Sequence, residues 1–465
     1  MQLDADFISK VLGNICMQNG PFPQNSSFSV DTRTVQKGDV FVALQGERVN
    51  GHDFIQEALD RGASGFILSK NRQEELLQKF GLELQDKHLL FVDDTLQALV
   101  ELARHWRSQF DYPVVGITGS VGKTTTKEMV RNILKLANTR HLASFGNQNS
   151  VIGVALNILK MRPEHQAAVF EVGISKRGSM KQLAALLRPT YALITKIGHA
   201  HMAGLGDLAS VAEEKRAVFS EFSDRDIGVI NGDQAELSQI AYAHPVVRFG
   251  LKTTNQIQAR KVVVSNNCIS FTAKIYNDRY SIVLPSCNEA RVLNALAAIS
   301  IGYLLKIPND ILVKGVEQPV VVEGRFQTIV HSSGSTLIND AYNSNPDSAK
   351  ASLLALEAYQ TDKKKVVVLG DMLELGIDSA FWHRQLGRFL SKVSNVHHVV
   401  LIGKEVQATQ KTLPLNVKSS YYESIDEAFE TLKTMLLEEN RVFLFKGSNS
   451  IGLCTLIDKL QAEKL

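Results

Sequence analysis

The chain has 465 residues, of which 44% are hydrophobic and 21% are charged, and its formal net charge is +3. A single hydrophobic core stops growing near ~250–300 residues, so we expect two to four domains. The nearly balanced charge excludes a global basic field of the kind that draws a protein to nucleic acid or to an anionic membrane. Any anionic partner must therefore be held by a local site.

The cysteines and the start of the chain favour a cytoplasmic location. Cys16, Cys268, Cys287 and Cys454 form no CxxC pair, which disfavours a disulfide framework and a thiolate zinc site. The first residues, MQLDADFISK, lack a basic segment followed by an apolar stretch, and no run approaches the ~20 apolar residues that span a bilayer. We expect a protein that is neither exported nor inserted in a membrane.

The pattern of the N-terminal region predicts a small α/β domain. The apolar runs DVFVAL, GFIL and LLFV alternate there with helical sequence such as FIQEALDRGA. A further helix, from about Thr95 to Gln109, ends before the proline of Tyr112-Pro113. We place the first domain at residues 1–93, just before this helix.

From Pro113 the pattern changes to strand, glycine loop and helix, with further strands at AAVFEVG and YALITKIG. This order is typical of a parallel sheet with helical crossovers and predicts a nucleotide-binding core. Residues 262–284 alternate as antiparallel hairpins do and predict a small appended sheet, and helix returns at ARVLNALAAISIGYLL. We place the central domain at residues 94–318.

A boundary near Gln318-Pro319 precedes a third series of strands and helices, which gives a domain at residues 319–465. Its strands are predicted at STLINDAY, KKKVVVLGDM, HHVVLIGK and RVFLFKGS. The strand KVVVLGD and its loop resemble half of a dinucleotide fold but lack GxGxxG. The predicted fold class is α/β with three domains: a small N-terminal α/β domain, a central P-loop-type parallel sheet and a C-terminal Rossmann-like domain.

The strongest local signal is VVGITGSVGKTTTKE, residues 114–128. A β-branched strand, a glycine loop and an amphipathic helix place backbone N–H groups around phosphate oxygens, Lys123 adds a positive charge, and the Thr124 hydroxyl can bind magnesium. The loop departs from GxxxxGK[ST], because Ile117 stands five residues before Gly122. A glycine turn with a surface lysine is the simpler alternative, but the flanking strand and helix favour phosphate. The predicted phosphate-site residues are Thr118, Gly119, Ser120, Gly122, Lys123, Thr124 and Thr125.

TGSVGKTTTKE resembles the ATP loop of the Mur ligases, and other segments agree with that family in order and approximate spacing. They are GNQNSVIG, FEVG, GHAHMAGLG and EEKRAVF in the central domain, and VEGRFQ, NDAYNSNP, LGDMLELG and FKGSNS in the third. The resemblance covers essentially the whole chain. It implies an ATP- and magnesium-dependent ligase that forms an amide bond during peptidoglycan precursor synthesis.

Within the family, residues 29–63 are most similar to members that join D-alanyl-D-alanine to UDP-N-acetylmuramoyl-tripeptide, and GDMLELG supports the same choice. The resemblance implies these two substrates as partners; we expect a monomeric enzyme and, from the balanced charge, no nucleic acid partner. A sister ligase that adds the third stem residue remains an alternative, because it shares a DTR-type turn and a comparable layout. From a different class, a P-loop ATPase switch would hydrolyse ATP without forming an amide, and a nucleotide-sugar binding protein would not turn ATP over.

The resemblance also implies metal ligands. Glu171 follows a buried strand and is expected to bind magnesium beside Thr124, although an ordinary charged strand end would give the same pattern. His201 matches a histidine expected near a second magnesium, whereas His199 has no counterpart and is expected to be a loop residue. Lys215 looks like a solvated helix charge by composition, but the resemblance implies a carbamylated lysine that binds the second magnesium. With Lys123 and His201, it is a predicted catalytic residue.

Three further residues are implied in ATP binding: Asn294 at adenine, Arg325 at phosphate and Asp340 at ribose. A lone helical asparagine is normally just exposed, and Arg325 and Asp340 could equally form an interdomain ion pair. Two pairs of residues depart from the family pattern. Lys196 and Ala203 stand where Asn and Glu are more common, and Ala290 and Arg291 stand where His and Asn are usual.

The resemblance places the substrates at all three domains. The uridine site is expected at the turn of residues 31–33 and at the loop of residues 43–52, although turn chemistry alone would explain the same residues. The implied substrate-binding residues are Asp31, Thr32, Arg33, Gly46 and His52 for the UDP end, Asn147 and Asn149 for the channel, and Asn343, Asn345, Lys446 and Ser448 for the stem peptide and dipeptide.

Overall fold

The structure is a computed structural model of the chain, and it describes residues 3–13, 16–18, 27–46, 49–174, 176–438 and 440–463. It divides into two compact units, and the division passes through strand β6. One unit comprises Met1–Gly116, Thr139–Val172 and Lys181–Thr190, and the other comprises Ile117–Asn138, Gly173–Met180 and Tyr191–Leu465. Within the described ranges, no helix has both the length and the apolar character needed to cross a membrane.

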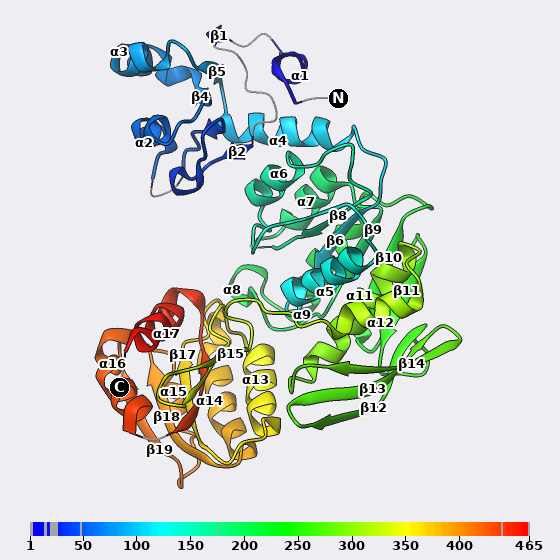
Figure 1. Cartoon of the computed structure of the whole chain (residues 1–465), viewed down its shortest axis with the longest axis vertical. Helices are drawn as coiled ribbons and strands as arrows, with labels where there is room; N and C mark the ends of the chain where they lie inside the picture. Colours follow the sequence, from blue (N-terminus) through cyan, green and yellow to red (C-terminus); the bar gives the residue numbers. More distant parts are fainter. Residues whose placement is uncertain are drawn as a thin grey trace. The chain divides into compact units, whose positions relative to one another are not determined.

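The first unit contains a five-stranded N-terminal sheet in the order β1-β5-β4-β3-β2 (Figure 1). Its strands are β1 Cys16–Gln18, β2 Phe28–Ser29, β3 Val40–Val42, β4 Gly65–Ser69 and β5 His88–Val92. The predicted apolar runs form β3, β4 and β5, which pair in parallel, and β1 is antiparallel to β5. Buried residues of α2 and α3 pack with those of the strands to form this domain's core.

The helices of this part are α1 Ala5–Leu12, α2 Ile55–Asp60, α3 Gln73–Leu84 and α4 Thr95–Arg107. Helix α4 is the one predicted before the proline, and it contacts elements on both sides of the predicted boundary at residue 93. The hydroxyl of Thr95 donates to the carbonyl of Ala43 at 2.9 Å, and Nε1 of Trp106 donates to the carbonyl of Met161 at 3.1 Å. The boundary itself stays a prediction.

The central sheet has nine strands in the order β14-β13-β12-β11-β10-β9-β6-β8-β7. They are β6 Val114–Thr118, β7 His141–Ala143, β8 Ala167–Glu171, β9 Tyr191–Ile194, β10 Ile227–Asn231, β11 Val246–Gly250, β12 Ile257–Ser265, β13 Cys268–Ile275 and β14 Asp278–Leu284. The predicted hairpins form, with β12, β13 and β14 antiparallel. The appended strands do not form a sheet of their own, because β12 also pairs with β11 and extends the central sheet.

The central helices are α5 Lys123–Leu136, α6 Val151–Ile158, α7 Ser179–Leu187, α8 Met202–Leu205, α9 Leu208–Arg216, α10 Ala235–Ser238, α11 Ala290–Leu304 and α12 Asn309–Glu317. Helix α5 starts directly after the glycine loop, and its predicted apolar face, Met129, Val130, Ile133 and Leu134, is buried. Burial of this face fixes the N-terminal end of α5 beside the end of β6. Short 3-10 turns cover Thr32–Thr34, Gly51–Phe54, Lys70–Arg72, Ala217–Phe219, Gly376–Asp378, Leu390–Lys392 and Asn449–Ile451.

The C-terminal sheet has six strands in the order β15-β16-β20-β17-β18-β19. They are β15 Gln327–Val330, β16 Thr336–Asn339, β17 Lys364–Gly370, β18 Val396–Ile402, β19 Lys418–Tyr422 and β20 Arg441–Lys446. The five strands from β16 to β20 pair in parallel, and β15 pairs with β16 in the antiparallel sense. Parallel strands buried on both faces give the continuous apolar runs seen in the sequence.

Helices cover both faces of this sheet (Figure 1). They are α13 Pro346–Ala358, α14 Ser379–Phe389, α15 Gln407–Gln410, α16 Ile425–Glu438 and α17 Leu453–Ala462. Buried residues of α13 and α14 form one core with the sheet, and buried residues of α16 and α17 form another on the opposite face. The predicted fold class, α/β with parallel-rich sheets in three domains, is confirmed.

Candidate active site

The glycine loop between β6 and α5 depends on two glycines with positive φ. Gly119 has φ +147° and Gly122 has φ +91°. A Cβ atom at Gly119 would collide with the side chain of Thr195, and a Cβ atom at Gly122 would collide with Asn294. Both positions therefore need glycine, for backbone freedom and for close approach, and such a loop can bring backbone N–H groups to a phosphate.

Side chains around this loop also suit a phosphate group. Lys123 is half-buried, and its ammonium group folds back to donate to the carbonyl of Gly119 at 2.9 Å. Ser120, Thr124 and Thr125 are buried. The fully buried hydroxyl of Thr118 has no hydrogen-bond partner among the described residues, which is costly unless a ligand or water meets it. The loop residues therefore fit the phosphates of ATP.

The segment that follows β9 holds the loop in place. The backbone N–H of Ser120 donates to the carbonyl of Lys196 at 2.7 Å. The Ser120 hydroxyl donates to the carbonyl of Gly198 at 2.9 Å and accepts from its N–H at 3.0 Å. The hydroxyl of Thr195 donates to the carbonyl of Val121 at 2.6 Å. The cradle is thus fixed by the protein itself, as electrostatic preorganisation requires.

Lys215 on α9 is only 1% exposed, so it is not the solvated helix charge that composition alone would suggest. Burial, and then the nearby ammonium of Lys123, hold the pKa of Lys215 well below its usual range, against the opposing effect of Glu214. The Glu214 carboxylate accepts from the backbone N–H groups of Gly178 at 2.9 Å and Met180 at 2.8 Å. These surroundings favour the neutral amine, which is the nucleophilic form of lysine.

Glu171 at the end of β8 is 1% exposed, which is unusual for an ordinary charged strand end. Nδ2 of Asn149 donates to the Glu171 carboxylate at 2.7 Å, and the backbone N–H of Glu171 donates to the hydroxyl of Ser144 at 3.0 Å. Asn147, in the same loop as Asn149, is exposed. Carboxylate oxygens are ligands that magnesium prefers. Across the described residues, however, no three His, Cys, Asp or Glu side chains are grouped to hold a metal, so a metal here needs other ligands as well.

Asn294 on α11 is half-buried, and its side-chain oxygen lies against the backbone of Gly122. It therefore abuts the phosphate loop and is not a freely exposed helical asparagine. Arg291, which the sequence left unexplained, lies one turn earlier on α11. Its guanidinium donates to the carbonyls of Val320 at 3.1 Å and Arg325 at 3.3 Å. Arg291 thus connects α11 to the segment that leads into the C-terminal sheet.

Arg325 and Asp340 have separate partners. The guanidinium of Arg325 lies 4.2 Å from the ring centroid of Tyr342. The carboxylate of Asp340 accepts from the backbone N–H of Phe326 at 3.0 Å and pairs with the ammonium of Lys446 at 3.2 Å. Within the described part of the chain, the ion pair of Asp340 is with Lys446 and not with Arg325. The alternative ion pair suggested by the sequence is therefore not formed.

A polar pocket of about 250 Å³ opens at the carboxyl ends of the C-terminal strands, next to the segment that follows β9. Four residues chosen from the sequence line it: His201, Asn343, Asn345 and Ser448. The sequence analysis missed the others, which are Ala200, Tyr342, Ser344, Leu373, Glu374, Asn449 and Ser450. Most of these belong to the quoted segments NDAYNSNP, LGDMLELG and FKGSNS, so the motifs were a signal that could have found them.

The hydrogen bonds of the pocket walls are internal. Lys446 is 2% exposed, and its ammonium donates to the carbonyl of Asn343 at 2.6 Å, so it supports this loop from within. The side chain of Asn345 caps α13 in a reciprocal capping box. The hydroxyl of Ser448 accepts from the backbone N–H of Leu373 at 2.9 Å. The loops around the pocket are therefore held by the protein's own hydrogen bonds.

His201 and Glu374 meet at the edge of this pocket. Nδ1 of His201 lies 2.7 Å from the Glu374 carboxylate, and the hydrogen bond from His201 lowers the pKa of Glu374 despite burial. Both residues have positive φ, +59° for His201 and +62° for Glu374, which is uncommon for residues other than glycine. His201 is thus held at this pocket by a partner that the sequence analysis did not name.

The turn of residues 31–33 in the N-terminal domain is stabilised by its own side chains. Arg33 and Asp31 form an ion pair at 2.6 Å, and this pairing lowers the pKa of Asp31. Both side chains are exposed, whereas Thr32 is buried. The local hydrogen bonds account for the turn, and the exposed charges remain accessible to a substrate.

The second predicted uridine element, the loop of residues 43–52, is described except for residues 47 and 48. His52 is buried, its Nε2 accepts from the backbone N–H of Ser69 at 2.9 Å, and burial lowers its pKa. Gly46 is exposed, and its N–H donates to the carbonyl of Val49 at 2.9 Å. His52 therefore anchors the loop, while Gly46 lies on its surface.

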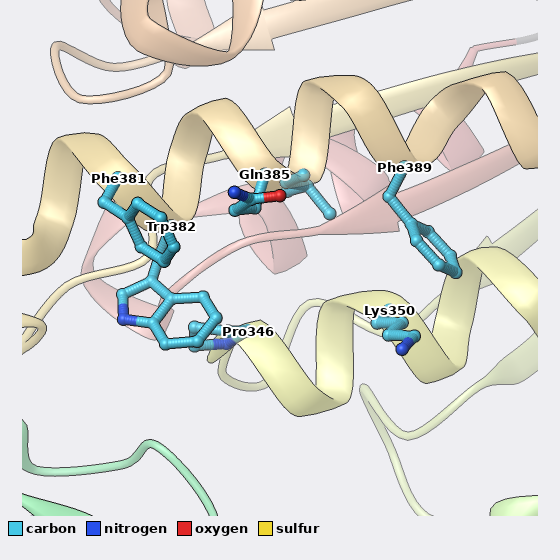
Figure 2. Close-up of a pocket in the computed structure, with 7 residues that line it drawn as sticks. Pro346, Lys350, Phe381, Trp382, Gln385 and Phe389 are labelled. Atoms are coloured by element: carbon cyan, nitrogen blue, oxygen red, sulfur yellow. The ribbon is translucent and has the colours of Figure 1, made fainter.

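A second, less polar groove lies between α13 and α14 (Figure 2). Phe381, Trp382 and Phe389 come from α14, and Pro346 and Lys350 come from the facing side of α13. Figure 2 shows the Trp382 indole beside Pro346, the first residue of α13. The same indole lies 4.4 Å, centroid to centroid, from the ring of His199, which belongs to the segment after β9.

Comparison with known proteins defines the class of this site. Three family models match the chain: "Mur ligase family, catalytic domain" at residues 26–107, "Mur ligase middle domain" at residues 117–302 and "Mur ligase, glutamate ligase domain" at residues 324–449. The chain belongs to the Mur ligase family. It is an ATP-dependent enzyme that forms an amide bond, which removes the P-loop switch and the nucleotide-sugar binding protein as alternatives.

Relatives within the family are similar over nearly their whole length. The UDP-N-acetylmuramoyl-tripeptide--D-alanyl-D-alanine ligases of Treponema pallidum and Bacillus subtilis are 34% and 33% identical to the chain. The alignments cover 94% of both chains for the first, and 93% of this chain and 92% of the relative for the second.

Solved structures agree with these relatives. A MurF structure from Acinetobacter baumannii has a TM-score of 0.85 at 27% identity and covers 100% of this chain and 99% of its own. The MurF ligase of Thermotoga maritima, solved in complex with ADP, has a TM-score of 0.78 at 25% identity and covers 94% and 97%.

Proposed function

We propose that this ligase joins D-alanyl-D-alanine to UDP-N-acetylmuramoyl-tripeptide, a step of peptidoglycan precursor synthesis that supports cell shape and division, and that it does so in the cytoplasm. The observation that carries the proposal is the similarity to enzymes of that name over more than nine tenths of both chains. A sister ligase that adds the third stem residue is the alternative. The likeness to a diaminopimelate-adding ligase is weaker, with a TM-score of 0.50 at 16% identity.

The reaction needs activation, because joining a carboxylate to an amine in water is uphill. The terminal carboxylate of the tripeptide attacks the γ-phosphorus of ATP, which gives an acyl phosphate and ADP. The amine of D-alanyl-D-alanine then attacks the acyl carbon, and the bond to phosphate breaks. Lys123 and the backbone N–H groups of residues 119–122 stabilise the charge that develops on phosphate, by position and electrostatics.

The remaining ATP contacts are assigned from the resemblance to the family. This resemblance assigns Asn294 to adenine, Arg325 to phosphate and Asp340 to ribose; in the structure Asn294 lies against Gly122 and Arg325 lies over Tyr342. We assign Thr118, Gly119, Ser120, Gly122, Thr124 and Thr125 to the phosphates. The orphaned hydroxyl of Thr118 gains a partner when a nucleotide binds, which lowers the cost of its burial.

Magnesium is the proposed metal, with Thr124, Glu171, His201 and a carbamylated Lys215 as its ligands. When bound, it would neutralise phosphate charge. The surroundings of Lys215 support carbamylation, since a neutral amine reacts with carbon dioxide and an ammonium does not. A carbamate also replaces a disfavoured buried cation by an oxygen anion, the ligand type that this hard cation prefers.

The C-terminal pocket is the proposed site for the dipeptide and the end of the stem peptide. Its amides and hydroxyls can bind the ammonium, amide and carboxylate groups of a short peptide. Asn343, Asn345 and Ser448 line it, and Lys446 positions the loop of Asn343. Asn147 and Asn149 are assigned to the channel for the longer substrate.

The UDP end is assigned to the N-terminal domain. The exposed pair of Asp31 and Arg33, with Thr32 and Gly46, offers charge and backbone groups to uridine and diphosphate, and the buried His52 fixes the loop. We propose domain boundaries at residues 1–93, 94–318 and 319–465, and a monomeric enzyme.

The test is a substrate matrix. Phosphate and amide product are measured with UDP-muramoyl peptides of two and three residues, each offered D-alanyl-D-alanine, D-glutamate, L-lysine or diaminopimelate. We expect product only with the tripeptide and D-alanyl-D-alanine. Robust addition of a single amino acid to the dipeptide substrate, with none of the D-alanyl-D-alanine product, would establish the sister ligase instead.

A further inference from the structure

Asp347, the second residue of α13, receives three contacts from the segment that follows β9. The ammonium of Lys196 lies 2.8 Å from one carboxylate oxygen. The backbone N–H of His199 donates to the other oxygen at 3.0 Å, and the ring Nδ1 of His199 lies 3.2 Å from it. These contacts join positions that are 151 and 148 residues apart in the chain.

The fit around this carboxylate is close. A Cβ atom at Gly198 would lie 2.6 Å from Oδ2 of Asp347, so only glycine admits the carboxylate at that distance. The ring of His199 also lies 4.4 Å, centroid to centroid, from that of Trp382, whose position in the groove Figure 2 shows. The side chain of Asp347 is 22% exposed, which puts its charge-assisted hydrogen bonds in a partly desolvated setting.

The same short segment holds the phosphate loop. Ser120 binds the carbonyl of Lys196 through its backbone and both backbone groups of Gly198 through its hydroxyl. Lys196 and His199 therefore contact Asp347 on α13, while the backbone groups of Lys196 and Gly198 contact Ser120 of the ATP loop. A shift of this segment must therefore disturb both the contact with α13 and the position of the phosphate loop.

Asp347 is also close in sequence to residues that line the polar pocket of the C-terminal domain, the proposed dipeptide site, which we call the acceptor pocket. Asn345, two residues earlier, lines the pocket and caps α13, and Pro346 between them has a fixed φ. Asn343, on the same loop, lines the pocket as well. The position of Asp347 thus sets where the start of α13 and this wall of the pocket lie.

We propose that Asp347, held by Lys196 and His199, is a positioning residue that keeps the acceptor pocket in register with the phosphate loop during ligation. The inference rests on the proposed function. An acyl phosphate is open to hydrolysis, so the amine must be held at the acyl carbon before water reaches it. Loss of the contact therefore lets the phosphate loop work while the amine is misplaced.

A simpler role for Asp347 is to stabilise α13, because a carboxylate in the first turn of a helix interacts favourably with the helix dipole. The two roles predict different effects for removal of the Lys196 side chain. Lys196→Ala removes the ammonium contact and leaves the two contacts of His199 and the first turn of α13 intact. If Asp347 acts only within its helix, Lys196→Ala has no effect on ligation.

The test is a double-mutant cycle of Lys196→Ala and Asp347→Asn in the full chain. For each variant, kcat and KM are measured for ATP and for D-alanyl-D-alanine, with the ratio of phosphate released to amide formed. We expect each single variant to lose about tenfold in kcat/KM for the dipeptide, to keep its KM for ATP within about twofold, and to release excess phosphate. The double variant should lose no more than the worse single variant.

Asp426→Asn is the matched control, because Asp426 and Lys459 form an ion pair at 2.7 Å elsewhere in the C-terminal domain. It should leave ligation unchanged. Additive losses in the cycle, a Lys196→Ala variant with the wild-type ratio of phosphate to amide, or an equal loss in Asp426→Asn would each overturn the proposal. If the unaltered enzyme uses a different amine, the proposed function fails, and the same cycle run with that amine still decides the role of Asp347.

Discussion

Two buried lysines in different domains have opposite surroundings. Lys446 in the C-terminal domain lies 3.2 Å from the Asp340 carboxylate and donates to backbone carbonyls, so the protein replaces the water that its ammonium lost. Lys215 in the central domain has a second ammonium, Lys123, nearby. Burial is the largest cause that lowers the pKa of both lysines; the next largest is Asp340, which opposes it at Lys446 despite Arg325, and Lys123, which adds to it at Lys215 despite Glu214. Since both lysines are buried, it is the dominant neighbouring charge that distinguishes the structural lysine from the candidate reactive one.

The largest expected effect follows from Lys123, the charge next to Lys215. Lys123→Ala should lower turnover by about a thousandfold, because the variant loses the charge that stabilises the transferring phosphate. The fold should persist, since the side chain is only half-buried at the start of α5. Steady-state phosphate release and circular dichroism measure the two outcomes. Lys135→Ala, an exposed lysine in the last turn of α5, is the control. Normal turnover in folded Lys123→Ala would place the phosphates elsewhere.

The next effect concerns Lys215 itself. Lys215→Ala should slow acyl phosphate formation by about a hundredfold, and short carboxylic acids should restore part of the rate by filling the vacated space. Lys215→Arg should not restore it, because arginine keeps the positive charge and cannot be carbamylated in this way. Product formation is followed with and without acetate or formate. Glu213→Ala, an exposed neighbour on α9, is the control. Wild-type rates in Lys215→Arg would reduce Lys215 to a packing residue.

The smallest expected effect on the chemistry, but a large one on stability, is at Lys446. Lys446→Met should destabilise the protein by about 3–5 kcal/mol, because it leaves the carboxylate of Asp340 buried without its partner. Thermal unfolding measures the loss, and Lys459→Met, at an exposed ion pair, should change stability by less than about 1 kcal/mol. If Lys446→Met keeps its melting temperature and loses only dipeptide binding, Lys446 contacts the substrate directly.

The sequence predicted the elements whose causes are local. The β-branched run before the glycines, the amphipathic face of α5 and the alternation of β12 to β14 are patterns within a few residues of one another, and each formed as expected. The pairing of β12 with β11 was missed, because which edge a strand joins depends on contacts that no local pattern encodes. The order of the strands in each sheet could not be predicted from hydrophobic periodicity either, because periodicity reports only local structure.

The same distinction between local and long-range causes applies to the candidate site. The phosphate loop is one continuous segment, so its motif predicted both its glycines and its lysine. The contact of Lys196 with Asp347 joins residues 151 positions apart, and Arg291 binds carbonyls of a later segment, so neither could be found from spacing. Burial of Lys215 was equally invisible, because a helix in VAEEKRAVF presents four charges and only packing decides which of them is enclosed.

The link made by Arg291 has a consequence for how freely this chain can vary. Its guanidinium binds two backbone carbonyls, and every amino acid supplies a carbonyl, so the side chains at positions 320 and 325 are not what Arg291 selects. Substitutions there can accumulate without loosening the connection from α11. An insertion or deletion between the two positions is different, because it changes the spacing of the acceptors that one planar group must reach. For anyone recombining domains between related ligases, the Arg291 contact requires that the length of this connector be preserved, whereas the side chain of Arg325 has to be kept for its own proposed role.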